Sequence, residues 1–92
     1  MLEGIKVFEN DAGIDDRGSI WTTWKKENFS DLNFNHDKFS ISKKNVLRGL
    51  HGDDKTWKLV TCIYGEIFQV VVDLRLDSKT YLQSESWHLT QD

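Results

Sequence analysis

The side chains best suited to chemistry in this sequence are Arg48, His51 and Lys58, which stand in one short segment. A guanidinium is a permanent cation whose forked donors suit phosphate, and an imidazole can exchange a proton near neutral pH. An ammonium stabilises a developing oxyanion as a point charge. Together these groups favour removal of a proton beside a carbonyl, on a substrate that carries phosphate.

Each candidate residue also has a simpler explanation. Taken alone, His51 is more often a core histidine with a satisfied hydrogen bond, and Lys58 at the start of a strand extends its ammonium into water. Arg17 follows two aspartates in a turn, where a surface ion pair competes with any ligand. Taken alone, His36 is an exposed turn residue, and His88 belongs to no motif.

Size and composition restrict the class of protein. The 92 residues suffice for one small domain with a thin core, and the absence of proline gives no sign of a linker. A net charge of -3 argues against a nucleic-acid partner held by bulk electrostatics. No apolar run reaches membrane-spanning length, and the N-terminus lacks the apolar core of a signal peptide. The lone Cys62 is expected to be a buried free thiol, which fits a reducing cytoplasm.

The predicted secondary structure is short strands separated by turns, with one helical turn around residues 27–29. Period-two alternation and β-branched or aromatic residues favour extended structure at residues 5–8, 19–24, 39–42, 46–51, 57–63, 66–74 and 85–89. Asn, Asp and Gly predict turns at residues 10–13, 15–18 and 77–79. The clearest hairpin joins residues 57–63 to 66–74 through Tyr64-Gly65. No segment has a sustained helical period, so we expect an all-β sandwich or barrel.

Four tryptophans are a large aromatic set for so short a chain. Such a set needs either a larger core than this sequence can build or a partner surface. We therefore expect a homodimer.

Several stretches, taken in order, resemble one family. They are Asp16-Arg17-Gly18, Phe39-Ser40-Ile41-Ser42, Val46-Leu47-Arg48-Gly49-Leu50-His51, Lys58-Leu59-Val60, residues 65–75 and Ser78. In this order they resemble the nucleotide-sugar 3,5-epimerases, the dTDP-4-dehydrorhamnose 3,5-epimerase-like cupins. The resemblance implies an antiparallel cupin-type jelly roll, of which residues 1–92 would form the N-terminal part as a single partial domain.

The resemblance also implies roles for matching residues. His51 matches the base that removes the proton beside the 4-keto group, and Lys58 matches the lysine that stabilises the enolate. Arg48 and Arg17 match arginines that bind the diphosphate and nucleotide.

Other positions depart from the family pattern. His36 and Lys38 replace the residues of a substrate-binding Gln-x-Asn, and Gly52-Asp53 replaces the usual Tyr-Gln after the histidine. Residues 54–57 form a shortened loop before the lysine, and Gln69 replaces a common aspartate. These departures resemble the epimerases of GDP-linked 4-keto-heptoses.

Length is the largest departure. A complete jelly roll has about eight strands, and the resemblance implies a second half that holds the tyrosine acid and the aspartate orienting the histidine. Tyr64 and Tyr81 are not at the acid's position. The chain is therefore expected to be a fragment of a longer enzyme or a truncated form with little or no activity.

The implied activity is epimerisation at C3, C5 or both of a dTDP- or GDP-linked 4-keto sugar, for bacterial capsule or lipopolysaccharide. No electrons are transferred, so no cofactor is expected. No metal is expected either, because Asp53 stands where a clustered metal site would have a second histidine. Two alternatives stay open: a 3,4-ketoisomerase of a related cupin group, and a non-catalytic module that binds sugar nucleotides. N-terminal strand exchange in a homodimer is a further implication of the resemblance.

Overall fold

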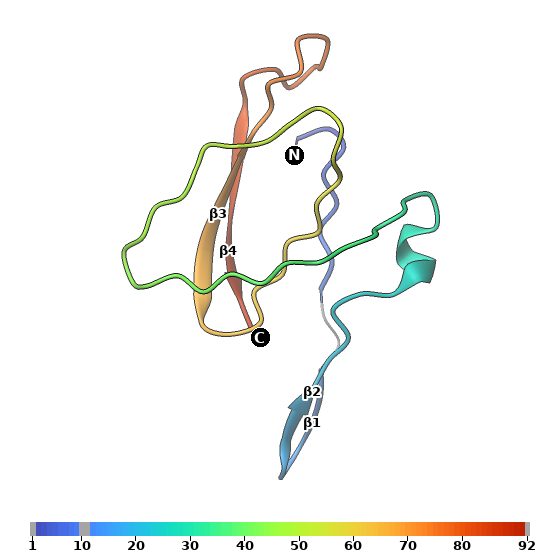
Figure 1. Cartoon of the computed structure of the whole chain (residues 1–92), viewed down its shortest axis with the longest axis vertical. Helices are drawn as coiled ribbons and strands as arrows, with labels where there is room; N and C mark the ends of the chain where they lie inside the picture. The colour runs from blue at the N-terminus through green and yellow to red at the C-terminus, as the bar shows by residue number, and fades with distance from the viewer. Residues whose placement is uncertain (1, 10–11, 92) are drawn as a thin grey trace. The chain divides into compact units, whose positions relative to one another are not determined.

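The computed structural model describes residues 2–9 and 12–91, in two compact units that we treat separately (Figure 1). The sheet unit comprises Met1–Thr23 and Val60–Asp92, and the loop unit comprises Trp24–Leu59. The turn predicted at residues 10–13 falls partly outside the described residues.

A small hairpin near the N-terminus belongs to the sheet unit. Strand β1 (Gly13–Asp15) pairs antiparallel with β2 (Gly18–Ile20), with Asp15 opposite Gly18. Gly18 has a φ of +136°, a backbone conformation that L side chains rarely adopt. The turn predicted at residues 15–18 is confirmed, whereas the strand predicted over 19–24 ends at Ile20.

The main sheet is formed by β3 (Glu66–Val72) and β4 (Ser84–Thr90), which pair antiparallel along their whole length. Side chains of successive residues in a strand point to opposite faces. The more buried face carries Trp87 opposite Gln69 and Leu89 opposite Ile67. The strands predicted within residues 66–74 and 85–89 are thereby confirmed.

The predicted hairpin partner of β3 was wrong. Residues 57–63 form no strand, and β4 takes the place predicted for them. Main-chain bonds close the connection between β3 and β4: Asp73 N–H donates to the Gln83 carbonyl at 2.9 Å, and Leu82 N–H donates to the Asp73 carbonyl at 2.7 Å. These bonds extend the ladder beyond Val72 and align the two strands. Local residue preferences did not reveal this pairing.

The Asp73 carboxylate organises the connection at residues 73–83. It accepts hydrogen bonds from Arg75 Nε at 3.0 Å, from Ser78 Oγ at 2.6 Å and from Thr80 Oγ1. The Arg75 guanidinium also donates to the Glu3 carbonyl at 2.6 Å, which joins the N-terminal segment to this connection. The Asp73 side chain is only 2% exposed, so the carboxylate is buried but fully bonded. The predicted turn at residues 77–79 lies in this network.

The loop unit contains one short 3₁₀ helix, η1 (Lys26–Phe29), which confirms the predicted helical turn. The Phe29 ring meets the Phe34 ring edge-on, with centroids 5.5 Å apart. The strands predicted at residues 39–42 and 46–51 are wrong, because neither segment joins a ladder among the described residues. Residues 5–8 of the sheet unit likewise form no strand. β-Propensity reflects packing on a paired neighbour, so it does not create a strand where no partner lies alongside.

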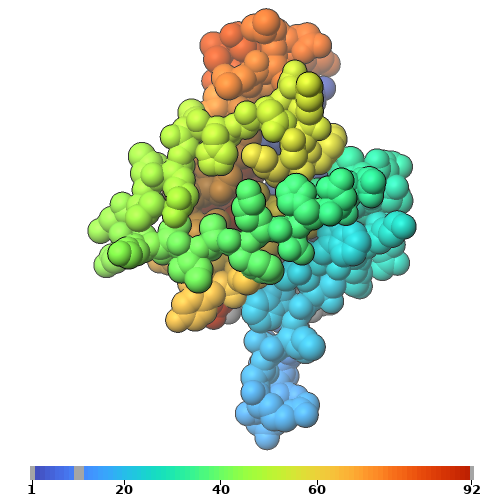
Figure 2. All heavy atoms as spheres, viewed as in Figure 1, coloured from blue at the N-terminus to red at the C-terminus, as the bar shows by residue number. Residues whose placement is uncertain are grey.

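The core within the described residues is small. Only Leu2 and Cys62 are buried apolar residues there, and burial of the Cys62 thiol is as predicted. Large apolar side chains of both units lie at the surface, among them Leu47, which is 95% exposed. Figure 2 shows residues 40–50, in light green, as a thin strip of side chains. The described strands are all antiparallel, and the described residues contain no α-helix. These two observations confirm the predicted all-β class. The cupin jelly roll stays a prediction.

Candidate functional site

The six predicted site residues are divided between the two units. Arg17 belongs to the sheet unit, and the other five belong to the loop unit. All six are exposed. The residues that the loop unit holds are His36, Lys38, Arg48, His51 and Lys58.

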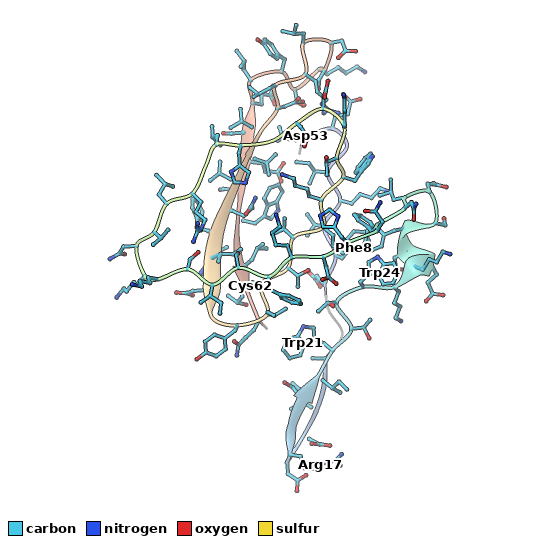
Figure 3. The ribbon with its side chains drawn as sticks, viewed as in Figure 1. Phe8, Arg17, Trp21, Trp24, Asp53 and Cys62 are labelled. Carbon is cyan, nitrogen blue, oxygen red and sulfur yellow. The ribbon has the colours of Figure 1, made fainter. Side chains whose placement is uncertain are left out.

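Arg17 lies in the turn between β1 and β2, where it is paired with Asp15 (Figure 3). Its Nη2 donates to Asp15 Oδ2 at 2.6 Å, and its main-chain N–H donates to Asp15 Oδ1 at 2.9 Å. These hydrogen bonds lower the pKa of the Asp15 carboxyl. The surface ion pair that competes with a ligand for Arg17 is therefore present, and a diphosphate would have to displace or share that carboxylate.

Arg48 is tethered by one of its five donors. Its Nε donates to Ser42 Oγ at 2.9 Å, and the intervening chain turns where Val46 N–H approaches the Lys43 carbonyl at 3.4 Å. Arg48 forms no ion pair with the described residues, so its terminal nitrogens stay available for an anion.

His51 and Lys58 stand at the two ends of a loop that Asp53 organises. The Asp53 side chain is labelled in Figure 3. Asp53 Oδ1 accepts from the main-chain N–H of Lys55 at 2.9 Å and of Thr56 at 2.7 Å. Its Oδ2 accepts from Thr56 Oγ1 at 3.0 Å. These bonds, and more weakly the charge of Lys58, lower the pKa of the Asp53 carboxyl.

The sequence indicated Asp53 as a departure from the family pattern and as an argument against a metal site, and it assigned Asp53 no part in shaping the loop. Aspartate commonly bonds main-chain N–H groups two and three residues ahead, and Thr56 adds a hydroxyl at the same place. That local signal was available in the sequence and predicts the observed turn.

His36 and Lys38 lie in an irregular segment of the loop unit. His36 Nδ1 is 3.4 Å from Asn35 Oδ1, a weak contact between neighbours. Neither His36 nor Lys38 bonds another predicted site residue within the described chain. Their predicted part in substrate binding therefore rests on position in the sequence.

Comparison with known proteins decides the family. A protein-family model described as dTDP-4-dehydrorhamnose 3,5-epimerase matches residues 1–92. The chain belongs to this family. It is 43% identical over 90 residues to the dTDP-4-dehydrorhamnose 3,5-epimerase of Salmonella typhimurium, covering 89% of this chain and 49% of that protein.

Two further relatives are similar to the chain at lower sequence identity. The dTDP-4-dehydrorhamnose 3,5-epimerase of Methanothermobacter thermautotrophicus is 41% identical over 86 residues, which cover 87% of this chain and 46% of that protein. The dTDP-4-dehydrorhamnose 3-epimerase of Streptomyces niveus is 33% identical, over 87% of this chain and 42% of that protein. The chain thus spans about half the length of the curated epimerases it matches. No solved structure matches it significantly.

The epimerase-family residues lie at an open surface. The two best-formed hollows of the described structure are shallow; one is lined by Lys25, Lys26, Glu27 and Ser30, and the other by residues 64–66, 90 and 91. Neither involves a predicted site residue. The described part contains no group of three or more His, Cys, Asp or Glu side chains that could hold a metal ion. In that same part no helix is long and apolar enough to cross a membrane.

Proposed function

We propose that this chain takes part in epimerisation at C3, C5 or both of a nucleotide-linked 4-keto sugar. The observation that carries the proposal is the family match over residues 1–92. By resemblance of the sequence motifs, His51 and Lys58 are proposed as the base and the enolate-stabilising lysine. Relatives named as 3,5-epimerase and as 3-epimerase both match the chain, so either number of inverted carbons is compatible with it.

The chemistry starts from the acidity that a 4-keto group confers on the hydrogens at C3 and C5. His51 removes one of them as a general base. The ammonium of Lys58 then stabilises the enolate oxygen, and return of a proton to the opposite face inverts the carbon. We assign no residue of this chain as the proton donor; Tyr64 and Tyr81 are not promoted to that role.

Binding of the substrate uses the other cations. Arg48 and Arg17 hold the diphosphate and nucleotide away from the reacting carbon and thereby orient it, and His36 and Lys38 also contact the substrate. The names of the relatives favour a dTDP-linked sugar, and the departures near His51 favour a GDP-linked heptose as the second candidate. No cofactor is required, because the reaction transfers protons and no electrons.

The biological setting follows from the same proposal. The product would enter bacterial capsule or lipopolysaccharide synthesis in the cytoplasm. We expect a homodimer, because apolar side chains and unpaired strand edges favour association. Exchange of N-terminal strands within it is what the family resemblance implies. Sedimentation showing only monomer at micromolar concentration would contradict the dimer.

Solvent isotope exchange tests the activity. A dTDP-4-keto-6-deoxyhexose and its GDP-linked counterpart are incubated with the protein in deuterated water and followed by NMR. Deuterium entering C3 or C5 supports proton abstraction, and inversion at those carbons identifies an epimerase. Movement of the keto group from C4 to C3 would identify a 3,4-ketoisomerase instead. Tight binding with no exchange would favour a non-catalytic module.

A further inference from the structure

We propose that Asp53 is a positioning residue, which holds the loop between His51 and Lys58 in the conformation that the reaction needs. This inference rests on the proposed function, because it assigns those two residues to the base and the enolate-stabilising group. It assigns a role in the reaction to Asp53, which stands at a position where the chain departs from the family pattern.

The hydrogen bonds of Asp53 are directed wholly into this loop. Both carboxylate oxygens are used, and their donors are Lys55 N–H, Thr56 N–H and Thr56 Oγ1, at 2.7 to 3.0 Å. Charge-assisted bonds of this kind are stronger than bonds between neutral groups. They hold residues 53–56 in a turn of defined shape.

The loop has little else to restrain it. The three bonds to Asp53 are the only hydrogen bonds found within residues 51–58. Every residue of this stretch is exposed, including Trp57 at 60%. A loop without burial or ladder bonds samples many backbone conformations, and each ordered residue costs entropy. Asp53 is therefore the group that reduces the range of orientations available to His51 and Lys58.

The charge of Asp53 is also relevant to Lys58. The hydrogen bonds from Lys55 and Thr56 are the main cause of the lowered pKa of the Asp53 carboxyl, and the charge of Lys58 adds the smallest contribution. The short loop of this chain thus carries its own counter-charge between the two proposed reactive groups.

The alternative is that Asp53 only forms the turn and has no effect on the reaction. Asp53→Ala removes both carboxylate oxygens, which accept the three hydrogen bonds. Asp53→Asn retains one oxygen that can accept from the Lys55 and Thr56 N–H groups, so it serves as the conservative rescue. Asp54→Asn is the matched control, because it makes the same change of charge one residue later. The full chain carries each substitution.

The first measurement is backbone order by NMR relaxation, which needs no turnover. We expect Asp53→Ala to lower the order parameters of His51, Lys55, Thr56 and Lys58 toward the flexible range, below about 0.6. Asp53→Asn should retain most of the order, and Asp54→Asn should match the wild type. Unchanged order at His51 and Lys58 in Asp53→Ala would overturn the inference.

The second measurement is deuterium exchange at C3 and C5 of the nucleotide sugar. Misplacement of reacting groups by about 1 Å can cost about 100-fold, so Asp53→Ala should lower kcat by roughly 10- to 100-fold and change KM by less than about 3-fold. Equal kcat for Asp53→Ala and the wild type would reduce Asp53 to a turn former and overturn its positioning role. The wild-type 92-residue chain is expected to exchange slowly and to invert little or not at all, because no proton donor is assigned. A complete absence of exchange would defeat the proposed function instead, while the relaxation data would still decide whether Asp53 orders the loop.

Discussion

At the scale of single residues, the proposed reactive groups are exposed and lightly bonded. His51 and Lys58 have no hydrogen bond to another described residue, and Arg48 uses a single donor. Electrostatic stabilisation of an enolate is strongest where water is excluded and the donor is held in place. The residue types therefore suit the chemistry, whereas their surroundings in these 92 residues supply little of the preorganisation.

His51→Ala should remove most deuterium exchange at C3 and C5, because the general base is lost. The expected loss is about 10²- to 10⁴-fold in rate, measured by NMR of the substrate in deuterated water. His88→Ala is the matched control: that imidazole lies on the sheet, 2.9 Å from Glu66, and has no proposed role in the reaction. Unchanged exchange in His51→Ala would show that another group acts as the base.

Asp15→Asn should strengthen binding of a nucleoside diphosphate, because the Asp15 carboxylate competes with phosphate for the Arg17 guanidinium. Exposed ion pairs are weak, so the expected gain in affinity is about 2- to 5-fold. Calorimetry with dTDP and GDP measures it, and Asp16→Asn controls for loss of a negative charge. Equal gains in both variants would indicate general electrostatics, with no direct part for the Arg17–Asp15 pair.

At the scale of elements, the connection between β3 and β4 depends on one buried carboxylate. Asp73 accepts bonds from Arg75, Ser78 and Thr80, and these bonds hold the pKa of the Asp73 carboxyl well below its usual range. A carboxyl with a depressed pKa stabilises the fold fully above its unfolded pKa, and the contribution is lost as the pH falls through the folded pKa.

Asp73→Asn should lower the stability of the sheet unit, and its effect should depend on pH. The difference in urea midpoint from the wild type should be largest near about pH 7 and shrink below about pH 4, where the Asp73 carboxyl of the unfolded chain begins to protonate while that of the folded chain stays ionised. Asp77→Asn is the matched control, because Asp77 lies in the same connection and its carboxylate accepts none of the hydrogen bonds described there. A difference that stayed constant from about pH 7 to about pH 2 would contradict this account.

At the scale of the whole molecule, the described residues leave much apolar surface in water. Leu47 and Ile41 are each 95% exposed, and two of the four tryptophans, Trp24 and Trp57, are 46% and 60% exposed. Contiguous exposed apolar surface is characteristic of an interface. The tryptophan count predicted either a larger core or a partner surface, and the homodimer expected from it stays a prediction.

The 92-residue chain should bind a nucleoside diphosphate weakly and epimerise poorly or not at all. Its cations are accessible, so phosphate attraction is retained, but the proposed base and lysine stand in water and no proton donor is assigned. Calorimetry with GDP and dTDP measures the binding, and NMR in deuterated water measures the turnover. Turnover typical of an enzyme, about 1 to 10³ per second, would contradict this prediction.

Local sequence patterns were sufficient for much of the structure and for the family. The turns at residues 15–18 and 77–79, the helical turn at η1 and the strands β3 and β4 follow from glycine and aspartate preferences and from period-two alternation. The ordered motifs around Arg48, His51 and Lys58 identified the family that the comparison confirmed. Their roles as site residues stay a proposal.

Only the tertiary structure decided which segments pair. The residues at 46–51 and 57–63 have strand-like composition, yet β3 pairs with β4, whose alignment is secured by the bonds around Asp73. A strand is stabilised by its ladder and by cross-strand packing, and both depend on residues distant in sequence. The turn at Asp53 was the opposite case, a local feature that the sequence determined and the structure made visible.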